Sequence, residues 1–404
     1  MKRAIVCLVG VALTALSARA QAPFRFEIAP RVALATPRVH DPRFVLRASR
    51  SLTLLAIQEV YGRSRLIATT SLDGGDNFFD PVPVTGSDVS VLGSGESGPA
   101  LALTGDGMCA AWEQSRPLGG SELVVAASPT GAVWNKPRRL TDVSGKPAGF
   151  VALAAAGSRV VAVWLDGRAG AAGKRDVYLA RSLDGGKTFE KNQLVAAGVC
   201  SSSRPAVALG EEGAVFVAWR GVTAESVRDI YVAASTDGGV TFAPPVNVAP
   251  DGWKSTDCPA SAPALAVSGK TLHVAWYSEG KGKRDVGLRW TTSMDGGASF
   301  SMPQLVSHGV LDPNHPELTV NPQGRVYLVF QGRPDAGDGW SPFKAYIVEV
   351  SDWVTATHGA VAPPGAYDKV SYPTGQQDAI GRLWVFWTAG EAILLSRARE
   401  ILTP

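Results

Sequence analysis

The stretch Ser71-Leu-Asp-Gly-Gly-Asp-Asn-Phe78 recurs along the chain with small changes. Three further copies keep the serine, the aspartate, the glycine pair and the final phenylalanine: Ser182–Phe189, Ser235–Phe242 and Ser293–Phe300. A degraded copy, Ser128–Trp134, lies between the first two, so that successive copies begin 57, 54, 53 and 58 residues apart. Self-similarity at such a period indicates that one unit of several secondary-structure elements is repeated and stacked.

Each intact copy lies between two short stretches that are rich in β-branched and aromatic residues. Asp176–Arg181 precedes the second intact copy, and Pro245–Val248 follows the third. Asp-Gly-Gly between two strands predicts a hairpin turn, because glycine adopts positive φ readily and the aspartate can bond the amides of the turn. The aromatic residue that ends each copy can then pack back over the turn.

A second landmark is a strand of alternating small and large apolar residues that ends in an aromatic residue. Its copies are Ala110–Trp112, Ala162–Trp164, Val217–Trp219, Val274–Trp276, Leu328–Phe330 and Val385–Trp387. Leu54–Gln58 occupies the same position earlier in the chain. Each repeat thus contains four strands, and repeated four-stranded antiparallel units are typical of a β-propeller. We predict an all-β chain that forms a single propeller of seven four-stranded blades, with six blades as the alternative.

The two ends of the chain are expected to close the ring. The last repeat, near Leu383 to Arg399, runs out of chain before its outer strand. The N-terminal segment Phe24–Leu34 resembles an outer strand such as Phe300–Val306. We therefore expect the N-terminal segment to complete the last blade, which would cover strand edges that are otherwise exposed.

The N-terminus has the three parts of a secretory signal peptide. Met1–Arg3 is basic, Ala4–Leu16 is apolar, and Ala18-Arg-Ala20 fits a cleavage site. We expect a signal peptide at residues 1–20, a propeller at residues 21–404, and a secreted or periplasmic location. No later apolar run approaches the roughly 20 residues that cross a bilayer.

Composition narrows the classes of partner. With 45% hydrophobic and 19% charged residues, the chain does not have the composition of a disordered protein. Loss of Lys2, Arg3 and Arg19 with the signal peptide would leave 36 basic and 36 acidic residues. A net charge near zero argues against nucleic acid or an anionic membrane as the main partner. A glycan or another extracellular ligand is expected instead, bound by a monomer.

The cysteines predict one disulfide. Cys200 and Cys258 occupy the same position in two successive repeats, and equivalent loops of neighbouring repeats lie side by side. An oxidising compartment would allow them to pair. Cys109 lies in an apolar run and is expected to be buried and unpaired. This spacing is no zinc signature, and we expect neither a metal nor a cofactor.

The phrase Ser-x-Asp-x-Gly-x-x-Phe/Trp is the Asp-box, and the chain resembles Asp-box (BNR-repeat) propellers of the sialidase, or neuraminidase, superfamily. The resemblance extends from about Arg38 to Ile401. In that superfamily the box is a structural turn on the face opposite the active site. The resemblance therefore assigns the box aspartates to folding rather than chemistry: Asp73, Asp184, Asp237 and Asp295.

Two sets of loops share the other rim of such a propeller, and they carry most of the clustered charged and polar side chains of the chain. Loops leading into the innermost strands supply His40, Asp41, Arg43, Glu96, Arg204, Asp312, Asn314, His315, Glu317 and Tyr372. Loops between the second and third strands supply Glu59, Arg63, Glu113, Arg116, Asp166, Arg168, Arg220, Glu279, Gln331, Arg333 and Asp335. For any one of these residues, solvated loop surface is the alternative interpretation.

A sialidase uses three arginines to bind a carboxylate, a tyrosine nucleophile activated by a glutamate, and an aspartate as acid/base. The resemblance implies that Arg43 is the first arginine and Arg204 the second, while Glu59 and Arg63 match the glutamate and arginine that follow the family's first-blade strand. Tyr372 precedes the last innermost strand, where the family places its nucleophile. No aspartate lies between Arg43 and Ser71, where the family places its acid, and no motif identifies a third arginine.

Two classes of function follow. The first is a secreted glycoside hydrolase of exo-sialidase type, or a relative that acts on another acidic sugar, with an incomplete catalytic set. The second is a non-catalytic Asp-box propeller that binds a glycan, a peptide or a partner protein. A polysaccharide lyase that uses His40 or His315 with a tyrosine or arginine is a further alternative.

Overall fold

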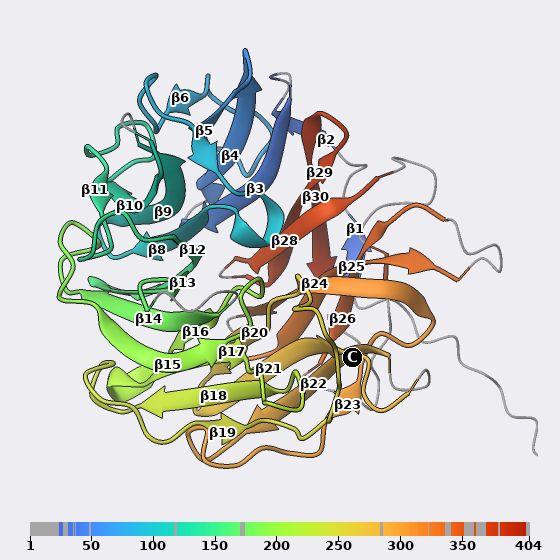
Figure 1. Ribbon diagram of the computed structural model, residues 1–404. Helices are drawn as coiled ribbons and strands as arrows, with labels where there is room; N and C mark the ends of the chain where they lie inside the picture. The colour runs from blue at the N-terminus through green and yellow to red at the C-terminus, as the bar shows by residue number, and fades with distance from the viewer. Residues whose placement is uncertain are drawn as a thin grey trace, which may run out of the picture.

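In the computed structural model, the described residues are 24–26, 31–34, 36, 38–47, 50–116, 119–169, 174–282, 286–321, 323–335, 341–350, 359–360, 369–378 and 380–400. The predicted signal peptide, residues 1–20, lies outside them. Within these ranges the chain folds into seven antiparallel sheets set around a central axis (Figure 1). No helix in the described ranges is long and apolar enough to cross a membrane.

The sheets follow one another along the chain, and blades 1 to 6 are each built on four strands in sequence order. Blade 1 contains β3(Val39–Leu46), β4(Leu52–Val60), β5(Arg63–Ser71) and β6(Val82–Pro83), and blade 2 contains β8(Ala100–Thr104), β9(Gly107–Ser115), β10(Ser121–Ser128) and β11(Arg138–Arg139), with β7(Val91–Leu92) added beside β9. Blade 3 contains β12(Ala148–Ala156), β13(Arg159–Asp166), β14(Arg175–Ser182) and β15(Gln193–Val199). Blade 4 contains β16(Ala206–Leu209), β17(Val215–Arg220), β18(Ile230–Ser235) and β19(Val246–Asn247).

The remaining blades complete the ring. Blade 5 contains β20(Ala264–Ser268), β21(Thr271–Ser278), β22(Gly287–Ser293) and β23(Gln304–Leu305). Blade 6 contains β24(Val310–Val320), β25(Val326–Pro334), β26(Lys344–Glu349) and β27(Gly359–Ala360). Blade 7 contains β28(Ser371–Gln377), β29(Arg382–Ala389) and β30(Ala392–Glu400). The prediction of a seven-bladed propeller is confirmed, and the six-bladed alternative is wrong.

The predicted aromatic-ended strands are the second strands of the blades, and they form the core. Trp112, Trp164 and Trp387 are each 0% exposed. The apolar clusters lie between neighbouring blades rather than within them. Trp112 of blade 2, for example, packs in one cluster with Leu55 and Ile57 of blade 1. Burial of each blade therefore depends on the presence of the blade beside it.

The Ser-x-Asp-Gly-Gly stretches form the predicted turns, and side-chain bonds hold them. In the first, Gly75 donates its N–H to Ser71 Oγ at 2.8 Å, and Asn77 donates its N–H to Asp73 Oδ1 at 2.9 Å. Hydrogen bonds from Asn77 lower the pKa of Asp73 to about 2. The degraded copy keeps the serine bond, from Gly131 N–H to Ser128 Oγ at 2.8 Å.

These turns lie on the face opposite the loops that lead into the innermost strands. Ser71, at the end of β5, pairs with Leu52 at the start of β4. His40, at the start of β3, pairs instead with Ile57, near the other end of β4. The antiparallel register thus separates the first turn from His40 by the length of the blade, and the other blades repeat this order.

Blade 7 takes its outer strand from the N-terminus, as predicted. In β1(Phe24–Phe26), Phe24 pairs with Glu400 of β30, and in β2(Arg31–Leu34), Arg31 pairs with Leu395. Leu34 is 4% exposed, within the core cluster between blades 7 and 1. The first and last parts of the described chain thus meet in one sheet.

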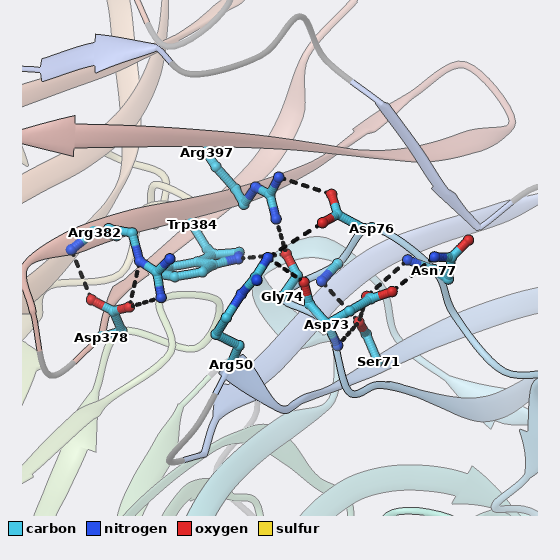
Figure 2. Close-up of polar contacts among 11 residues, drawn as sticks. Arg50, Ser71, Asp73, Gly74, Asp76, Asn77, Asp378, Arg382, Trp384 and Arg397 are labelled. Atoms are coloured by element: carbon cyan, nitrogen blue, oxygen red, sulfur yellow. Dashed lines mark hydrogen bonds and ion pairs between the residues drawn. The ribbon is translucent and has the colours of Figure 1, made fainter.

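A polar cluster reinforces the same seam on the turn face (Figure 2). The carbonyl of Gly74, in the first turn, accepts hydrogen bonds from Trp384 Nε1 at 3.1 Å and from Arg397 Nη1 at 2.7 Å. Asp76 pairs with Arg397 at 2.8 Å and with Arg50 at 3.3 Å. The turn of blade 1 is therefore bound directly to the last two strands of the ring.

The predicted disulfide is present. Cys200 and Cys258 are bonded, with Cα atoms 5.6 Å apart. The bond joins the loop before β16 to the loop before β20, so it links neighbouring blades on the face opposite the Ser-x-Asp-Gly-Gly turns. Cys109 is free and fully buried, as expected, and burial raises the pKa of its thiol to about 12.

Removal of residues 21–36 tests the closure of the ring. A chain that begins at residue 37 loses β1 and β2 and exposes the edge of β30, and burial of Leu34 alone contributes about 2 kcal/mol. We expect a lower thermal midpoint, measured by circular dichroism, than for a control chain that begins at residue 21. Equal midpoints for the two chains would show that these strands do not stabilise the ring.

Candidate functional site

A small cavity of about 180 Å³ lies at one end of the propeller axis, between the innermost strands; we call it the funnel. Blades 2 to 5 line it with pairs of small and aliphatic residues, such as Ala100 and Leu101 of β8 or Ala264 and Leu265 of β20. Its polar side chains come from the innermost strands of blades 1, 6 and 7 and from the segments just before β8 and β16: Arg43, His315, Glu317 and Tyr372, with Glu96 and Arg204. The funnel thus has an apolar side and a densely charged side.

The strands that carry the charged side leave regular geometry at the level of the funnel. Asp41 in β3, His315 in β24 and Tyr372 in β28 have φ of 54°, 52° and 50°. Each lies where the pairing with the next strand shifts its register. A β-bulge changes the direction in which side chains point. A non-glycine residue at positive φ costs about 1–3 kcal/mol, and both bulges and such strained residues occur often at functional sites.

Each of these three residues precedes a proline in the sequence: Pro42, Pro316 and Pro373. Arg204 and Ala262, whose backbones also border the funnel, precede Pro205 and Pro263. An X-Pro pair in or just before the innermost strand therefore recurs in these five blades and is a sequence signal for the funnel.

Tyr372, His315 and Glu96 form one contact chain inside the funnel. The rings of His315 and Tyr372 lie 4.3 Å apart between centroids, and His315 Nδ1 lies 2.5 Å from Glu96 Oε1. Burial opposes ionisation of Glu96, but the His315 hydrogen bond and the charge of Arg204 outweigh it and lower the pKa of Glu96. Burial raises the pKa of Tyr372, and the charges of Glu96 and Asp41 add to that effect. An anionic glutamate thus lies near a protonated phenol.

The two arginines in the funnel are cations without an ion-pair partner among the described residues. Arg43 donates to the carbonyl of Pro42 at 3.0 Å and is 9% exposed. Burial lowers the pKa of Arg204, and the charge of Arg43 lowers it further. The carboxylates of Glu96, Glu317 and Asp41 act in the opposite direction, without forming an ion pair with it. Two guanidinium groups that repel each other in a small cavity are suited to a shared anionic ligand, above all a planar carboxylate.

Behind the funnel wall, His40 lies between two carboxylates. Its Nδ1 is 3.2 Å from Asp41 Oδ2, and its Nε2 is 3.3 Å from Glu59 Oε1. The bond to Asp41 is the main cause that raises the pKa of His40. Burial tends to raise the pKa of Asp41, but the hydrogen bonds that its carboxylate accepts from His40 and from the N–H of Gly95 outweigh burial and lower that pKa. The group is thus an ion pair that joins β3 to the end of β4.

The structure brings together three of the five catalytic and binding residues predicted from the sequence. Arg43, Arg204 and Tyr372 line the funnel, whereas Glu59 and Arg63 do not. Glu59 accepts a hydrogen bond from Ser64 at 2.7 Å, and exposed Arg63 donates to a loop carbonyl. The reason is that β4 and β5 extend past the funnel before they turn.

Glu96, and not Glu59, is the glutamate that is linked to Tyr372 through His315. The sequence indicates Glu96 only as one of the many polar residues of the rim loops. It lies in the short 3-10 turn η2(Gly95–Ser97), which leads into β8 and carries no family motif. Within the described part of the chain, no group of three or more His, Cys, Asp or Glu side chains could hold a metal ion.

Comparison with known proteins identifies the fold. No protein-family model and no curated protein matches the sequence. The α-L-arabinofuranosidase Arb93A from Fusarium graminearum, solved with an iminosugar inhibitor, superposes with a TM-score of 0.52 at 15% identity, over 82% of this chain and 99% of that one. The Trypanosoma rangeli sialidase in complex with the inhibitor DANA gives a TM-score of 0.51 at 13% identity, over 91% of this chain. The chain spans about half, 55%, of the length of that sialidase. These likenesses establish a shared propeller architecture.

The His40 ion pair predicts a pH dependence of stability. Because folding raises the pKa of His40 above its usual 6.5, its contribution is complete below that value and is lost as pH rises through the folded pKa. Asp41 stays ionised in this range, since its pKa is lowered. His40→Gln should therefore reduce the free energy of unfolding more at about pH 5.5 than at about pH 8.5, as measured by urea denaturation.

The control is His308→Gln, at an exposed position. It removes a histidine that makes no contact with Asp41 or Glu59, and so it reports the effect of the substitution itself. A loss for His40→Gln that is constant, or that grows with pH, would contradict the proposed ion pair.

Proposed function

We propose that this protein is a secreted, sialidase-like Asp-box propeller that binds glycans through a sugar carboxylate and acts on them as a glycoside hydrolase with an incomplete catalytic set. One observation carries the proposal: Arg43 and Arg204, without ion-pair partners in the described chain, share a small cavity with Tyr372 and Glu96. The Ser-x-Asp-Gly-Gly turns on the opposite face support membership among Asp-box propellers. Secretion rests on the predicted signal peptide.

The size of the funnel favours a single terminal sugar. About 180 Å³ is less than the roughly 300–1,000 Å³ of cavities that enclose drug-sized ligands. A carboxylate would lie between Arg43 and Arg204, and the sugar ring would face the aliphatic pairs of blades 2 to 5. Each charge-assisted hydrogen bond to the carboxylate contributes about 1.5–3 kcal/mol.

Tyr372 is the nucleophile in this proposal, and Glu96 is its base. A phenol with a raised pKa is protonated at neutral pH and needs a base when it attacks. Glu96 Oε2 is buried and has no hydrogen-bond partner among the described residues, so it can accept a proton. Attack of Tyr372 Oη on the anomeric carbon would break the bond to the leaving-group oxygen while the phenol proton passes to Glu96.

Protonation of the leaving group is the weak step. Asp41 is 3% exposed and its carboxylate is already bonded to Gly95 and His40, so it is badly placed to donate a proton. Activity on natural glycosides should consequently be poorer than on substrates with activated leaving groups, which need little protonation. The same observation favours the second candidate function, a module that binds acidic glycans without cleaving them.

A ligand and substrate panel tests the proposal. Isothermal calorimetry with N-acetylneuraminic acid and glucuronic acid, against neutral galactose and arabinose, should show binding of at least one acidic sugar and none of the neutral ones. Hydrolysis of fluorogenic sialosides, glucuronides and arabinofuranosides then separates an enzyme from a binding module. Equal affinity for neutral and acidic sugars would overturn the role of the two arginines.

Arg43→Ala tests the carboxylate site directly. Loss of one charge-assisted contact of about 1.5–3 kcal/mol should weaken binding of the acidic sugar by about ten-fold or more, measured by calorimetry. Arg63→Ala is the matched control, because that arginine is exposed outside the funnel. If Arg63→Ala weakens binding as much as Arg43→Ala does, the assigned site is wrong.

Tyr372→Phe separates catalysis from binding. Removal of the hydroxyl should abolish turnover of a fluorogenic sialoside yet leave the affinity for the acidic sugar within about two-fold, because Arg43 and Arg204 remain. Tyr61→Phe, at a side chain that is 99% exposed, should alter neither quantity. Undiminished turnover in Tyr372→Phe would exclude the nucleophile assignment.

A further inference from the structure

The short turn η2 of blade 2 reaches the charged side of the funnel and contacts residues of three other blades. Its first two residues, Gly95 and Glu96, face different partners there. We infer that Asp41 and Gly95 are positioning residues: Asp41 fixes the turn, and the turn sets where Tyr372 lies relative to Glu96. The inference rests on the proposed function for its catalytic meaning, but its structural content can be tested without activity.

The first step concerns the space above Gly95. A Cβ atom built on Gly95 would lie 2.2 Å from both Cζ and Oη of Tyr372, and 2.8 Å from Cε1. Gly95 also has φ of +60°, a left-handed conformation that disfavours other residues. The phenol of Tyr372 therefore rests directly on the backbone of Gly95, in space that any side chain would fill.

The second step is the anchor of this glycine. Gly95 donates its N–H to Asp41 Oδ2 at 2.7 Å, and Asp41 donates its own N–H to Thr388 Oγ1 at 3.0 Å. Asp41 is 3% exposed, and His40 holds the same carboxylate oxygen. Asp41 thus connects blade 1, the turn of blade 2 and β29 of blade 7, so Gly95 cannot move away from Tyr372 freely.

The third step is the link to Glu96. Glu96 follows Gly95 directly, and its carboxylate is held by His315 at 2.5 Å. The ring of His315 packs on the ring of Tyr372. The backbone N–H of Tyr372 donates a hydrogen bond to Gln331 Oε1 at 2.8 Å. Tyr372 is therefore enclosed between Gly95 and His315. The Gly95–Glu96 peptide couples the phenol to the carboxylate that would take its proton.

Gly95→Ala is the test variant, and Gly62→Ala is its matched control. Gly62 also has a positive φ, +76°, but a Cβ there meets nothing within 4 Å. Both substitutions bear the cost of a left-handed alanine, and only Gly95→Ala must displace the phenol. Asp41→Ala removes the anchor, whereas Asp41→Asn keeps an oxygen that can accept the Gly95 N–H.

The readout is the ionisation of Tyr372, followed by ultraviolet difference titration against Tyr372→Phe made in each background. Wild type and Gly62→Ala should titrate above the usual value near 10, because burial raises the pKa of Tyr372. In Gly95→Ala the value should return toward 10, since the phenol is pushed from its buried position. Asp41→Ala and Asp41→Asn both remove a charge that raises this pKa, so the two are compared with each other. Asp41→Ala, which also releases Gly95, should titrate closer to 10 than Asp41→Asn does.

Activity and binding provide an independent readout. With a fluorogenic sialoside, Gly95→Ala should lose about 100-fold in kcat, the usual effect of a misplaced reacting group, while the affinity for the acidic sugar changes less than about two-fold. An unchanged Tyr372 titration in Gly95→Ala overturns the inference, and so does an equal shift in Gly62→Ala. If no variant binds or cleaves an acidic sugar but the titration shifts as expected, the proposed function fails while the positioning role stands.

Discussion

A propeller blade buries its apolar faces only against the two blades beside it, and this constraint governs the whole molecule. The core clusters lie between blades, and Trp112 of one blade packs with Leu55 of the next. A ring left open at one seam would expose two such faces together with a strand edge. The pairing of β30 with β1 and β2, and the bonds from Arg397 to the first turn, are therefore conditions for the rest of the fold.

Closure also explains why the funnel can hold strained residues. Asp41, His315 and Tyr372 keep positive φ because neighbouring blades bond their surroundings from several directions. Such conformations persist only where the surrounding structure over-determines them. The rigid ring thus supplies the stability that permits irregular backbone at its axis, and the irregular backbone directs charged side chains into the cavity.

The architecture was predictable from sequence because short sequence patterns, repeated along the chain, indicate the turns and strands of each blade. The turn of Ser71–Phe78 and the strand of Ala110–Trp112 each recur at a fixed period, and each acts within its own blade. The funnel was predictable only in part. Arg43 and Tyr372 could be placed by resemblance, since each lies at the start of an innermost strand.

The partner of Tyr372 could not be placed in this way. Glu59 matches the family pattern because it follows a strand of blade 1, but it is not among the residues that line the funnel. Glu96 enters the funnel from a turn of blade 2, whose residues bond Asp41 and His315, 54 and 219 residues away in sequence. No local pattern reports such contacts, although the recurring X-Pro pairs mark the strands where they occur.

The shared sheet of the first and last strands has a consequence for biosynthesis. β1 and β2 are made first, but their partner β30 is the last strand of the described chain to be synthesised. The N-terminal strands therefore remain unpaired until β30 has been synthesised. Contacts of such long sequence separation slow folding. Throughout that interval the nascent chain offers free strand edges to which chaperones, or other chains, can bind.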